Sequence, residues 1–257
     1  MTAAVKLGTT RPAVARATGI AARVADLDWT RIAADLEARG AATTGPLLVD
    51  DECRALAARY AGETGFRSRV VMARHGFGQG EYKYFAYPLP ALVAGLRGAL
   101  YPKLAPVAAR WHEAMGRDAD FPATLDAYTN RCHAAGQTRP TPLLLRYGAG
   151  DYNCLHQDLY GALAFPIQAT ILLSAPAVDG KNGDFEGGEF VLVEQRPRMQ
   201  SRPEVVPLRQ GEAVLFAVNE RPVQGKRGTY RVKMRHGVSR IRRGERMTLG
   251  VIFHDAK

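Results

Sequence analysis

The feature that most constrains this chain is a series of short apolar segments after Pro142, each ended by a turn signal. They are Leu143 to Tyr147, Gln168 to Leu173, Phe190 to Glu194, Val205 to Leu208, Ala213 to Val218, Arg231 to Val238 and Met247 to His254. Many short strands with such punctuation favour a double-sheet jelly roll, the cupin-like double-stranded β-helix. Asp179-Gly180 and Asn182-Gly183 mark a predicted loop that joins its sheets.

The first half of the chain is more typical of helices. The predicted elements are helices over Leu27 to Arg39, from Asp50 onward and over Leu89 to Met115, and strands over Leu47 to Val49 and Phe66 to Met72. Asp28 is a candidate cap and Gly40 a candidate end for the first helix, while the third can be two helices that meet near Tyr101-Pro102. We therefore predict an α+β protein, with a mainly helical support region over residues 25–126 and a jelly-roll core over residues 127–257.

The charge of the chain suggests an anionic partner. The 257 residues carry a net charge of +10, and ten cations fall between Arg221 and Arg246 against one acid, Glu245. Clustered Lys and Arg attract polyanions such as nucleic acid, although a basic surface can also serve solubility alone.

Cysteine usage and hydropathy indicate a cytoplasmic protein. Three cysteines, Cys53, Cys132 and Cys154, are too few and too odd in number for a disulfide framework, which is typical of a reducing compartment. No apolar run is long enough to cross a membrane. Residues 1–24 are Ala-rich, basic and free of acids, like an organellar transit peptide, but they lack the apolar core of a secretory signal. We expect them to form a disordered arm.

A His and an Asp stand two residues apart soon after the first predicted strand, in Arg146-Tyr-Gly-Ala-Gly-Asp-Tyr-Asn-Cys-Leu-His156-Gln-Asp158. Residues i and i+2 of an extended segment point to one side, so both side chains can bind one ion. His236 is the best candidate for a third ligand. Two His and one carboxylate leave half of an octahedral ion open, which is the ligand set of non-haem Fe(II) oxygenases. The alternative is that His156 and Asp158 only form a hydrogen-bonded core pair.

Arg246 stands at the start of an apolar segment, with Thr248 two residues further on. An inward Arg on a strand beside a metal can clamp a carboxylate through paired hydrogen bonds. If the site were only a core pair, this charge would be buried without a partner. Tyr147 is a candidate second donor to the same ligand, and Gln168 and Arg235 are candidate wall residues.

A family resemblance rests on several motifs together: Arg146-Tyr147 with Gly150 before His156, Gly187-Gly188-Glu189-Phe190, Leu208-Arg-Gln-Gly-Glu-Ala-Val-Leu-Phe216, His236 and Arg246. This pattern resembles the Fe(II)/2-oxoglutarate-dependent dioxygenases, with spacing like the prolyl-hydroxylase type. Cys132-His-Ala-Ala-Gly-Gln-Thr-Arg-Pro-Thr-Pro and Glu194-Gln-Arg-Pro-Arg-Met-Gln-Ser-Arg resemble, more narrowly, a bacterial branch described as acting oxidatively on methylated, damaged DNA. The resemblance covers Ala127 to Ala256 well and the earlier residues loosely.

The resemblance implies a ligand set and a reaction. Fe(II) would be held by His156, Asp158 and His236, and 2-oxoglutarate by Arg246, Thr248 and Tyr147. O2 is the oxidant, and ascorbate is a possible stimulant. 2-Oxoglutarate would be decarboxylated to succinate while a substrate C–H bond is hydroxylated, and a hydroxylated N-methyl group would leave as formaldehyde.

Three hypotheses about function remain open at this point. The first is oxidative demethylation of alkylated DNA or RNA bases. The second is hydroxylation of a protein side chain or an amino acid, because AlkB-type dealkylases carry a second Arg where this chain has Ile252. The third is a non-catalytic nucleic-acid-binding or sensing module. None of them calls for a membrane or an obligate protein partner.

Aromatic and basic segments are candidate substrate contacts. Tyr82, Tyr84 and Phe85 end a Gly-rich loop that starts near Arg74, and they either stack on a base or pack in the core. The basic run from Arg221 to Arg243 flanks His236, so we expect it to hold phosphates across the mouth of the metal site.

Several other metal-ligating side chains fit ordinary roles better. Structural zinc at Cys132, His133 and Cys154 is disfavoured because the chain has no Cys-x-x-Cys spacing. We expect His75, His112 and His254 to be surface or core residues.

Overall fold

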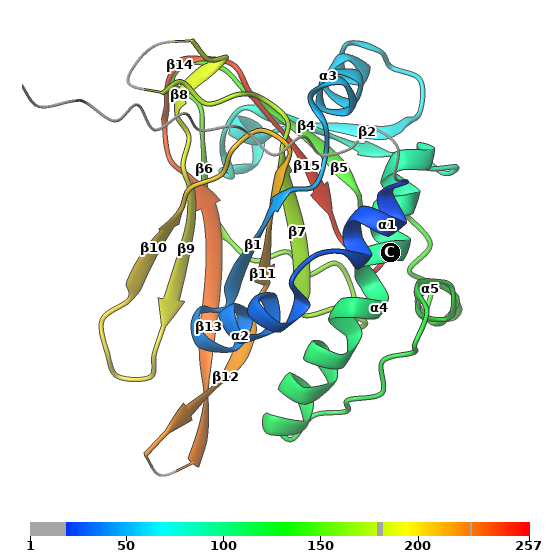
Figure 1. Cartoon of the computed structure of the whole chain (residues 1–257), viewed down its shortest axis with the longest axis vertical. Helices are drawn as coiled ribbons and strands as arrows, with labels where there is room; N and C mark the ends of the chain where they lie inside the picture. Colours follow the sequence, from blue (N-terminus) through cyan, green and yellow to red (C-terminus); the bar gives the residue numbers. More distant parts are fainter. Residues whose placement is uncertain (1–18, 179–181, 227) are drawn as a thin grey trace, which may run out of the picture.

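Two antiparallel sheets face each other in the computed structural model, which describes residues 19–178, 182–226 and 228–257 (Figure 1). The larger sheet has the order β1 (Ala41–Pro46), β11 (Glu212–Ala217), β7 (Ile167–Leu172), β15 (Arg246–Val251), β5 (Leu143–Tyr147), β4 (Glu81–Phe85) and β2 (Phe66–Val71). The smaller sheet has the order β10 (Arg202–Val206), β9 (Phe190–Gln195), β13 (Gly228–Val238), β6 (Tyr152–His156) and β3 (Gly78–Gln79), with β12 (Glu220–Gly225) paired to β13. A separate ribbon pairs β14 (Ile241–Gly244) with β8 (Phe185–Gly187).

The chain alternates between the two sheets along most of its second half. Strands β5, β7, β11 and β15 lie in the larger sheet, and β6, β9, β10 and β13 lie in the smaller one. Side chains from the two inner faces pack together, as Phe190 of β9 does against Phe216 of β11, with ring centroids 4.8 Å apart. Leu192 and Met234 belong to the same hydrophobic core, which continues through the larger sheet to Leu215 and Leu249 on its other face. This arrangement confirms the predicted jelly roll.

Helices cover the outer side of the larger sheet (Figure 1). They are α1 (Ile20–Ala25), α2 (Trp29–Arg39), α3 (Asp50–Ala58), α4 (Ala91–Ala114) and α5 (Leu125–Ala134). There are also two short 3-10 turns, η1 (Arg59–Ala61) and η2 (Met72–His75), and η2 leads into β3 of the smaller sheet. Helix α2 begins two residues later than the predicted Leu27, but its predicted cap and end are confirmed: the carboxylate of Asp28 accepts from the amide of Arg31 at 2.9 Å, and Gly40 has a φ of 73°. No helix of these described segments is long and apolar enough to span a membrane.

Helix α4 is continuous although it contains Pro102 and Pro106, so the expected break near Tyr101-Pro102 is wrong. Each Pro removes one helical hydrogen bond. Burial compensates for this loss, because the side chains of Leu100, Tyr101 and Leu104 are fully buried against the core. Tertiary packing therefore overrides the local preference of proline.

Two further expectations for the first half need correction. Leu47 to Val49 do not form a strand: the amides of Leu47 and Leu48 both donate to the carbonyl of Gly211, at 2.8 and 3.0 Å, so this apolar run marks a buried turn after β1. Residues 20–25 form α1, with Val24 in the core, and are not a disordered arm. Residues 1–18 and the Asp179-Gly180 turn lie outside the described residues.

Element boundaries differ from the sequence pattern in other places. The segment predicted at Val205 to Leu208 is β10, which starts three residues earlier, and α5, β8, β12 and β14 have no counterpart among the predicted elements. Helix α5 does carry a start signal, since Thr124 accepts from the amide of Ala127 at 3.3 Å. The division at residue 126 stays a prediction, and β1 to β4 before it belong to the two sheets.

A buried ion pair anchors α4 to the segment after β15. The guanidinium of Arg97 donates to Asp255 at 2.6 Å and to the carbonyls of Ile252 and Phe253 at 2.9 and 2.8 Å. Both charged side chains are almost completely buried. Asp255 also accepts from Tyr87 at 2.8 Å and lies 2.8 Å from His133, so its charge is fully engaged.

Replacing Arg97 with Leu should lower the free energy of unfolding by about 3–5 kcal/mol, because the carboxylate of Asp255 would stay buried without its cation. Urea denaturation measures this loss. Lys103→Ala, an exposed position on the same helix, is the control and should change it by less than about 0.5 kcal/mol. A loss of similar size in both variants would contradict the anchoring role.

Candidate active site

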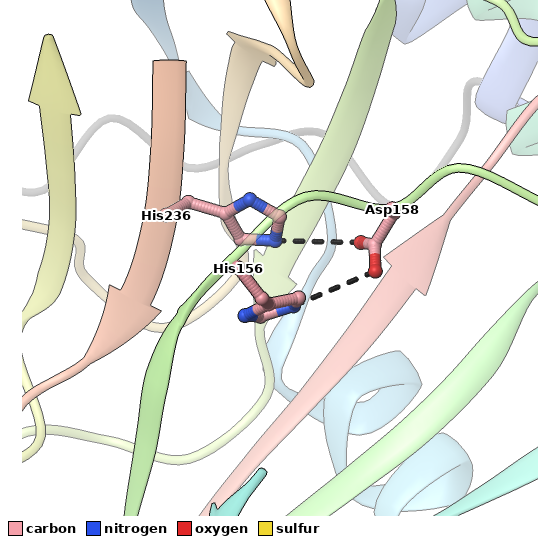
Figure 2. A group of neighbouring side chains, drawn as sticks. All are labelled: His156, Asp158 and His236. Atoms are coloured by element: carbon pink, nitrogen blue, oxygen red, sulfur yellow. Dashed lines mark ion pairs between the residues drawn. The ribbon is translucent and has the colours of Figure 1, made fainter. Parts of the chain in front are cut away.

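The three predicted metal-binding side chains converge in the structure. His156, the last residue of β6, is the cross-strand partner of His236 on β13, and their ring centroids are 4.2 Å apart. Asp158 lies two residues beyond the end of β6 and points back at both rings (Figure 2). One potential ligand atom from each residue lies within 4.8 Å of the others. This spacing suits a single metal ion.

The charge states of Asp158 and His236 suit metal binding. The carboxylate oxygens of Asp158 lie 3.4 Å and 3.3 Å from Nε2 of His156 and His236 (Figure 2). Burial raises the pKa of Asp158, but its hydrogen bonds to the two imidazoles outweigh burial and hold the pKa well below its usual range. Burial lowers the pKa of His236, and the nearby His156 lowers it further. A neutral imidazole and an ionised carboxylate are the forms that bind metals.

The ring orientation of His156 is set by its backbone. Its Nδ1 lies 2.8 Å from the carbonyl oxygen of Cys154, which can only accept, so Nδ1 carries the proton. Nε2 is then left with a lone pair toward the cavity. Burial lowers the pKa of His156, and the hydrogen bond and charge of Asp158 raise it more strongly. Such an outer contact fixes the tautomer of a metal-binding His.

Two neutral donors hold the carboxylate of Asp158. The hydroxyl of Tyr160 donates to one oxygen at 2.7 Å, and the amide of Gln168 donates to the other at 2.8 Å. Burial and the charge of Asp158 raise the pKa of Tyr160 well above its usual range, so the phenol keeps its proton. The hydroxyl of Tyr84 donates to that of Tyr160 at 3.1 Å. Sequence reasoning missed Tyr160, although its position two residues after Asp158 follows the same alternation as His156 and Asp158.

A cavity of about 200 Å³ opens beside these residues. Its wall includes Gln168, as predicted, together with Tyr147, Arg246 and Thr248. Arg246 and Thr248 share the inner face of β15, and Arg246 is the cross-strand partner of Tyr147 on β5. The cavity therefore brings the expected 2-oxoglutarate residues beside the expected metal ligands.

Arg246 is a buried cation without an acidic partner in the described part of the chain. Its side chain is 2% exposed, and its Nε and Nη1 atoms have no hydrogen-bond acceptor there. Burial lowers the pKa of Arg246 to about 10, so the guanidinium stays charged at neutral pH. An unpaired buried charge is costly, which indicates that an anionic ligand completes this site.

Gly188 leaves room for the stem of Arg246. A Cβ atom at Gly188 would lie 2.8 Å from Cδ of Arg246 and 2.2 Å from Cδ1 of Ile241, and the φ of Gly188 is 63°. A larger residue would therefore displace the guanidinium or strain the backbone. This gives the Gly187-Gly188 motif a physical role in the site.

Several candidate residues lie elsewhere. Arg235 is exposed and does not line the cavity, so its expected wall role is wrong. Tyr84 and Phe85 are buried on β4, and only Tyr82 of the three stacking candidates lines the cavity. His254 is fully buried and its Nδ1 accepts from the amide of Phe165 at 3.1 Å.

The basic run does not reach across the cavity mouth as expected. Strand alternation turns Arg231, Lys233 and Arg235 to the outer face of β13, because His236 faces inward. Arg221 is buried and donates to Glu194 at 2.5 Å. Of the remaining cations, Arg242 and Arg243 pair with Glu189 and Glu186, Arg240 contacts Gly150, and Arg227 lies outside the described residues.

A jelly roll that gathers two imidazoles, one carboxylate and an unpaired Arg in one cavity has the architecture of the Fe(II)/2-oxoglutarate-dependent oxygenases. Residues 80–256 match the model of a family described as "Oxygenase, catalysing oxidative methylation of damaged DNA", and the chain belongs to this family. The family match and the cluster of two His and one Asp identify it as an Fe(II)- and 2-oxoglutarate-dependent dioxygenase, which uses O2.

Other known proteins are similar to this chain in sequence or in fold. Two uncharacterized proteins of Mycobacterium tuberculosis are each 51% identical over 172 residues, which are 67% of this chain and 72% of theirs. A Pseudomonas putida prolyl-4-hydroxylase has a TM-score of 0.52 at 17% identity, over 89% of this chain and 100% of that one. A Trichoplax adhaerens prolyl hydroxylase, solved with a hypoxia inducible factor peptide fragment, has a TM-score of 0.54 at 13% identity, over 88% and 89%. At these identities the two hydroxylases show a shared fold only.

Replacing Tyr160 with Phe should weaken Fe(II) binding by about tenfold or more, because the carboxylate of Asp158 would lose a donor that orients it. Calorimetric titration of the metal-free protein with Fe(II) under anaerobic conditions measures this change without turnover. Tyr101→Phe is a matched control, since its buried hydroxyl has no hydrogen-bond partner in the described structure and lies outside the cavity wall. Equal Fe(II) affinity in both variants would remove Tyr160 from the site.

Proposed function

We propose that this dioxygenase removes methyl groups oxidatively from alkylated DNA or RNA bases. The observation that carries the proposal is the match to a family whose description names damaged DNA. The net charge of +10 is consistent with a polyanionic substrate. Hydroxylation of an N-methyl group gives an N-hydroxymethyl group, which breaks its C–N bond and releases formaldehyde. The chemistry of this class therefore removes a methyl group.

The proposal assigns roles to the residues of the cavity. His156, Asp158 and His236 would hold Fe(II), and Arg246, Thr248 and Tyr147 would hold 2-oxoglutarate. When bound, Fe(II) supplies the activation of O2 that couples oxidation of 2-oxoglutarate to succinate and CO2 with hydroxylation of a C–H bond. Tyr160 and Gln168 would keep the carboxylate of Asp158 oriented.

The three metal-binding side chains fit Fe(II), and the unpaired guanidinium of Arg246 fits 2-oxoglutarate. Two neutral imidazole nitrogens and one carboxylate are suitable Fe(II) ligands. The unpaired Nε and Nη1 atoms of Arg246 would donate to the far carboxylate of 2-oxoglutarate, with the hydroxyls of Thr248 and Tyr147 beside them. Apolar wall residues such as Leu145, Phe190 and Val238 would keep water from the reacting groups.

One observation favours a second candidate function, hydroxylation of a protein side chain or an amino acid. Arg246 is the only Lys or Arg among the described residues of the cavity wall. Ile252, at the position of the second Arg of AlkB-type dealkylases, is 1% exposed and packs with Tyr84 and Leu143. Within the cavity, the residues that the structure describes therefore offer no second cation to a base or a phosphate.

Replacing Arg246 with Met should weaken 2-oxoglutarate binding about ten- to hundredfold or more, because each hydrogen bond to a charged group contributes about 1.5–3 kcal/mol. The thermal midpoint without ligand should stay equal or rise, since an unpaired buried charge is removed. Thermal denaturation with and without 2-oxoglutarate and a redox-inert divalent metal measures both effects. Arg235→Met, on the outer face of β13, is the matched control. Full 2-oxoglutarate-dependent stabilisation in the Arg246 variant would assign the clamp to another residue.

The substrate proposal predicts that the enzyme with Fe(II), 2-oxoglutarate and O2 releases formaldehyde and succinate in equal amounts from a single-stranded oligonucleotide with one N-methylated base. The unmethylated oligonucleotide should give no formaldehyde, and His236→Ala should give neither product. A plot of the logarithm of the oligonucleotide affinity against the logarithm of the salt concentration should have a slope of about −0.7 for each phosphate that the protein neutralises. Succinate formed only with a peptide or an amino acid, without formaldehyde, would favour the second function.

A further inference from the structure

The cavity opens to solvent on one side, next to strand β6. The side chain of His156 is 34% exposed, whereas those of Asp158 and His236 are 11% and 7% exposed. A substrate must therefore approach the three residues from the side of His156.

A short loop between η2 and β3 borders this opening and carries an exposed aromatic ring. Phe77 is 47% exposed and also lines the cavity. Its ring stacks on that of His75, with centroids 5.3 Å apart and planes inclined by 24°. His75 therefore supports one face of the Phe77 ring, which stays partly exposed beside the entrance.

The loop is tied firmly to the strand that bears His156. The amide of Cys154 donates to the carbonyl of Phe77 at 2.9 Å, and Gly78 pairs with Asn153. A Cβ atom at Gly78 would lie 2.4 Å from the carbonyl oxygen of Tyr152, and its φ is 125°, so the close approach depends on this glycine. The position of Phe77 relative to the metal ligands is therefore fixed by backbone contacts.

The surroundings of Phe77 suit an anionic partner with flat, apolar rings. The segment from Ala73 to Gln79 contains no acid, and Arg74 is exposed and makes no ion pair within the described ranges. Arg240 lies over the ring of Tyr152, the cross-strand partner of Gln79, at 5.0 Å. Arg74 thus precedes the ring of Phe77 in the same loop, and Arg240 lies beside the strand that pairs with this loop. Exposed aromatic rings combined with nearby cations are a common means of binding single-stranded nucleic acid without sequence preference.

We propose that Phe77, backed by His75, is a stacking platform for an unpaired nucleobase at the entrance to the cavity, with Arg74 and Arg240 contacting the adjacent phosphates. This inference rests on the proposed nucleic-acid function and adds the surface that recognises the substrate. A base inside a duplex cannot reach the buried ligands, so the platform selects single strands or bases that have left the stack.

The test uses the full enzyme with Phe77→Ala, Phe77→Leu and Phe77→Trp, and a dye-labelled single-stranded oligonucleotide with one 1-methyladenine. Fluorescence anisotropy gives the Kd, and formaldehyde release gives kcat and KM. The Ala and Leu variants should raise the Kd and the KM roughly 5- to 100-fold with little change in kcat, since base stacking on an aromatic ring contributes about 1–3 kcal/mol. The Trp variant should bind as tightly as the wild type or more tightly. Leu155→Ala, an exposed apolar position on β6 outside the cavity wall, is the control and should leave both constants unchanged.

Two results would contradict the stacking role of Phe77. Only the second of them would also contradict the proposed function. If the wild type demethylates the oligonucleotide and all three Phe77 variants match it, base stacking on Phe77 is refuted while the demethylase function stands. If the wild type neither binds nor demethylates the oligonucleotide but turns over a peptide, both proposals fail together.

Discussion

The rest of the site depends on one buried charge that no acid in the described part of the chain pairs with. The guanidinium of Arg246 lies between the two sheets, and the charge of Glu189 raises its pKa. That carboxylate is already engaged by Ser239 and lies 3.6 Å from Arg242. Keeping such a cation unpaired costs folding free energy, and a chain that retains it at the wall of a cavity gains a strong binding point for a dicarboxylate.

Strand register brings this charge and the metal ligands together. Pairing of β6 with β13 sets His156 opposite His236, and pairing of β15 with β5 sets Arg246 opposite Tyr147. The two pairs belong to different sheets, so the way in which the sheets pack against each other determines the distance between the pairs. A slip of one residue in either pairing would turn these side chains to the opposite face. The core packing that fixes the register is therefore also what fixes the active site.

Much of this arrangement could be predicted from the sequence. The strands of the second half have short, clear apolar patterns, and the two-residue spacing of His156 and Asp158 places both side chains on the same face of an extended segment. The jelly roll and the grouping of His236 and Arg246 with that pair follow from these patterns and the family resemblance. The same alternation predicts that Arg231, Lys233 and Arg235 face away from His236, which net charge alone does not show. Strand β4 was missed because a Gly-rich sequence precedes it and its burial comes from distant residues. The platform at Phe77 depends on the pairing of β3 with β6, which no local pattern predicts.

The central claim is that one cavity holds a metal at His156, Asp158 and His236 and a dicarboxylate at Arg246. A crystal structure with Mn(II) and 2-oxoglutarate, prepared without O2, tests it most directly. We predict an anomalous scattering peak bound by the three side chains, and a 2-oxoglutarate whose far carboxylate lies within hydrogen-bonding distance of Nε or Nη1 of Arg246. A metal bound elsewhere, or a 2-oxoglutarate whose carboxylate is held by a different cation, would contradict the account.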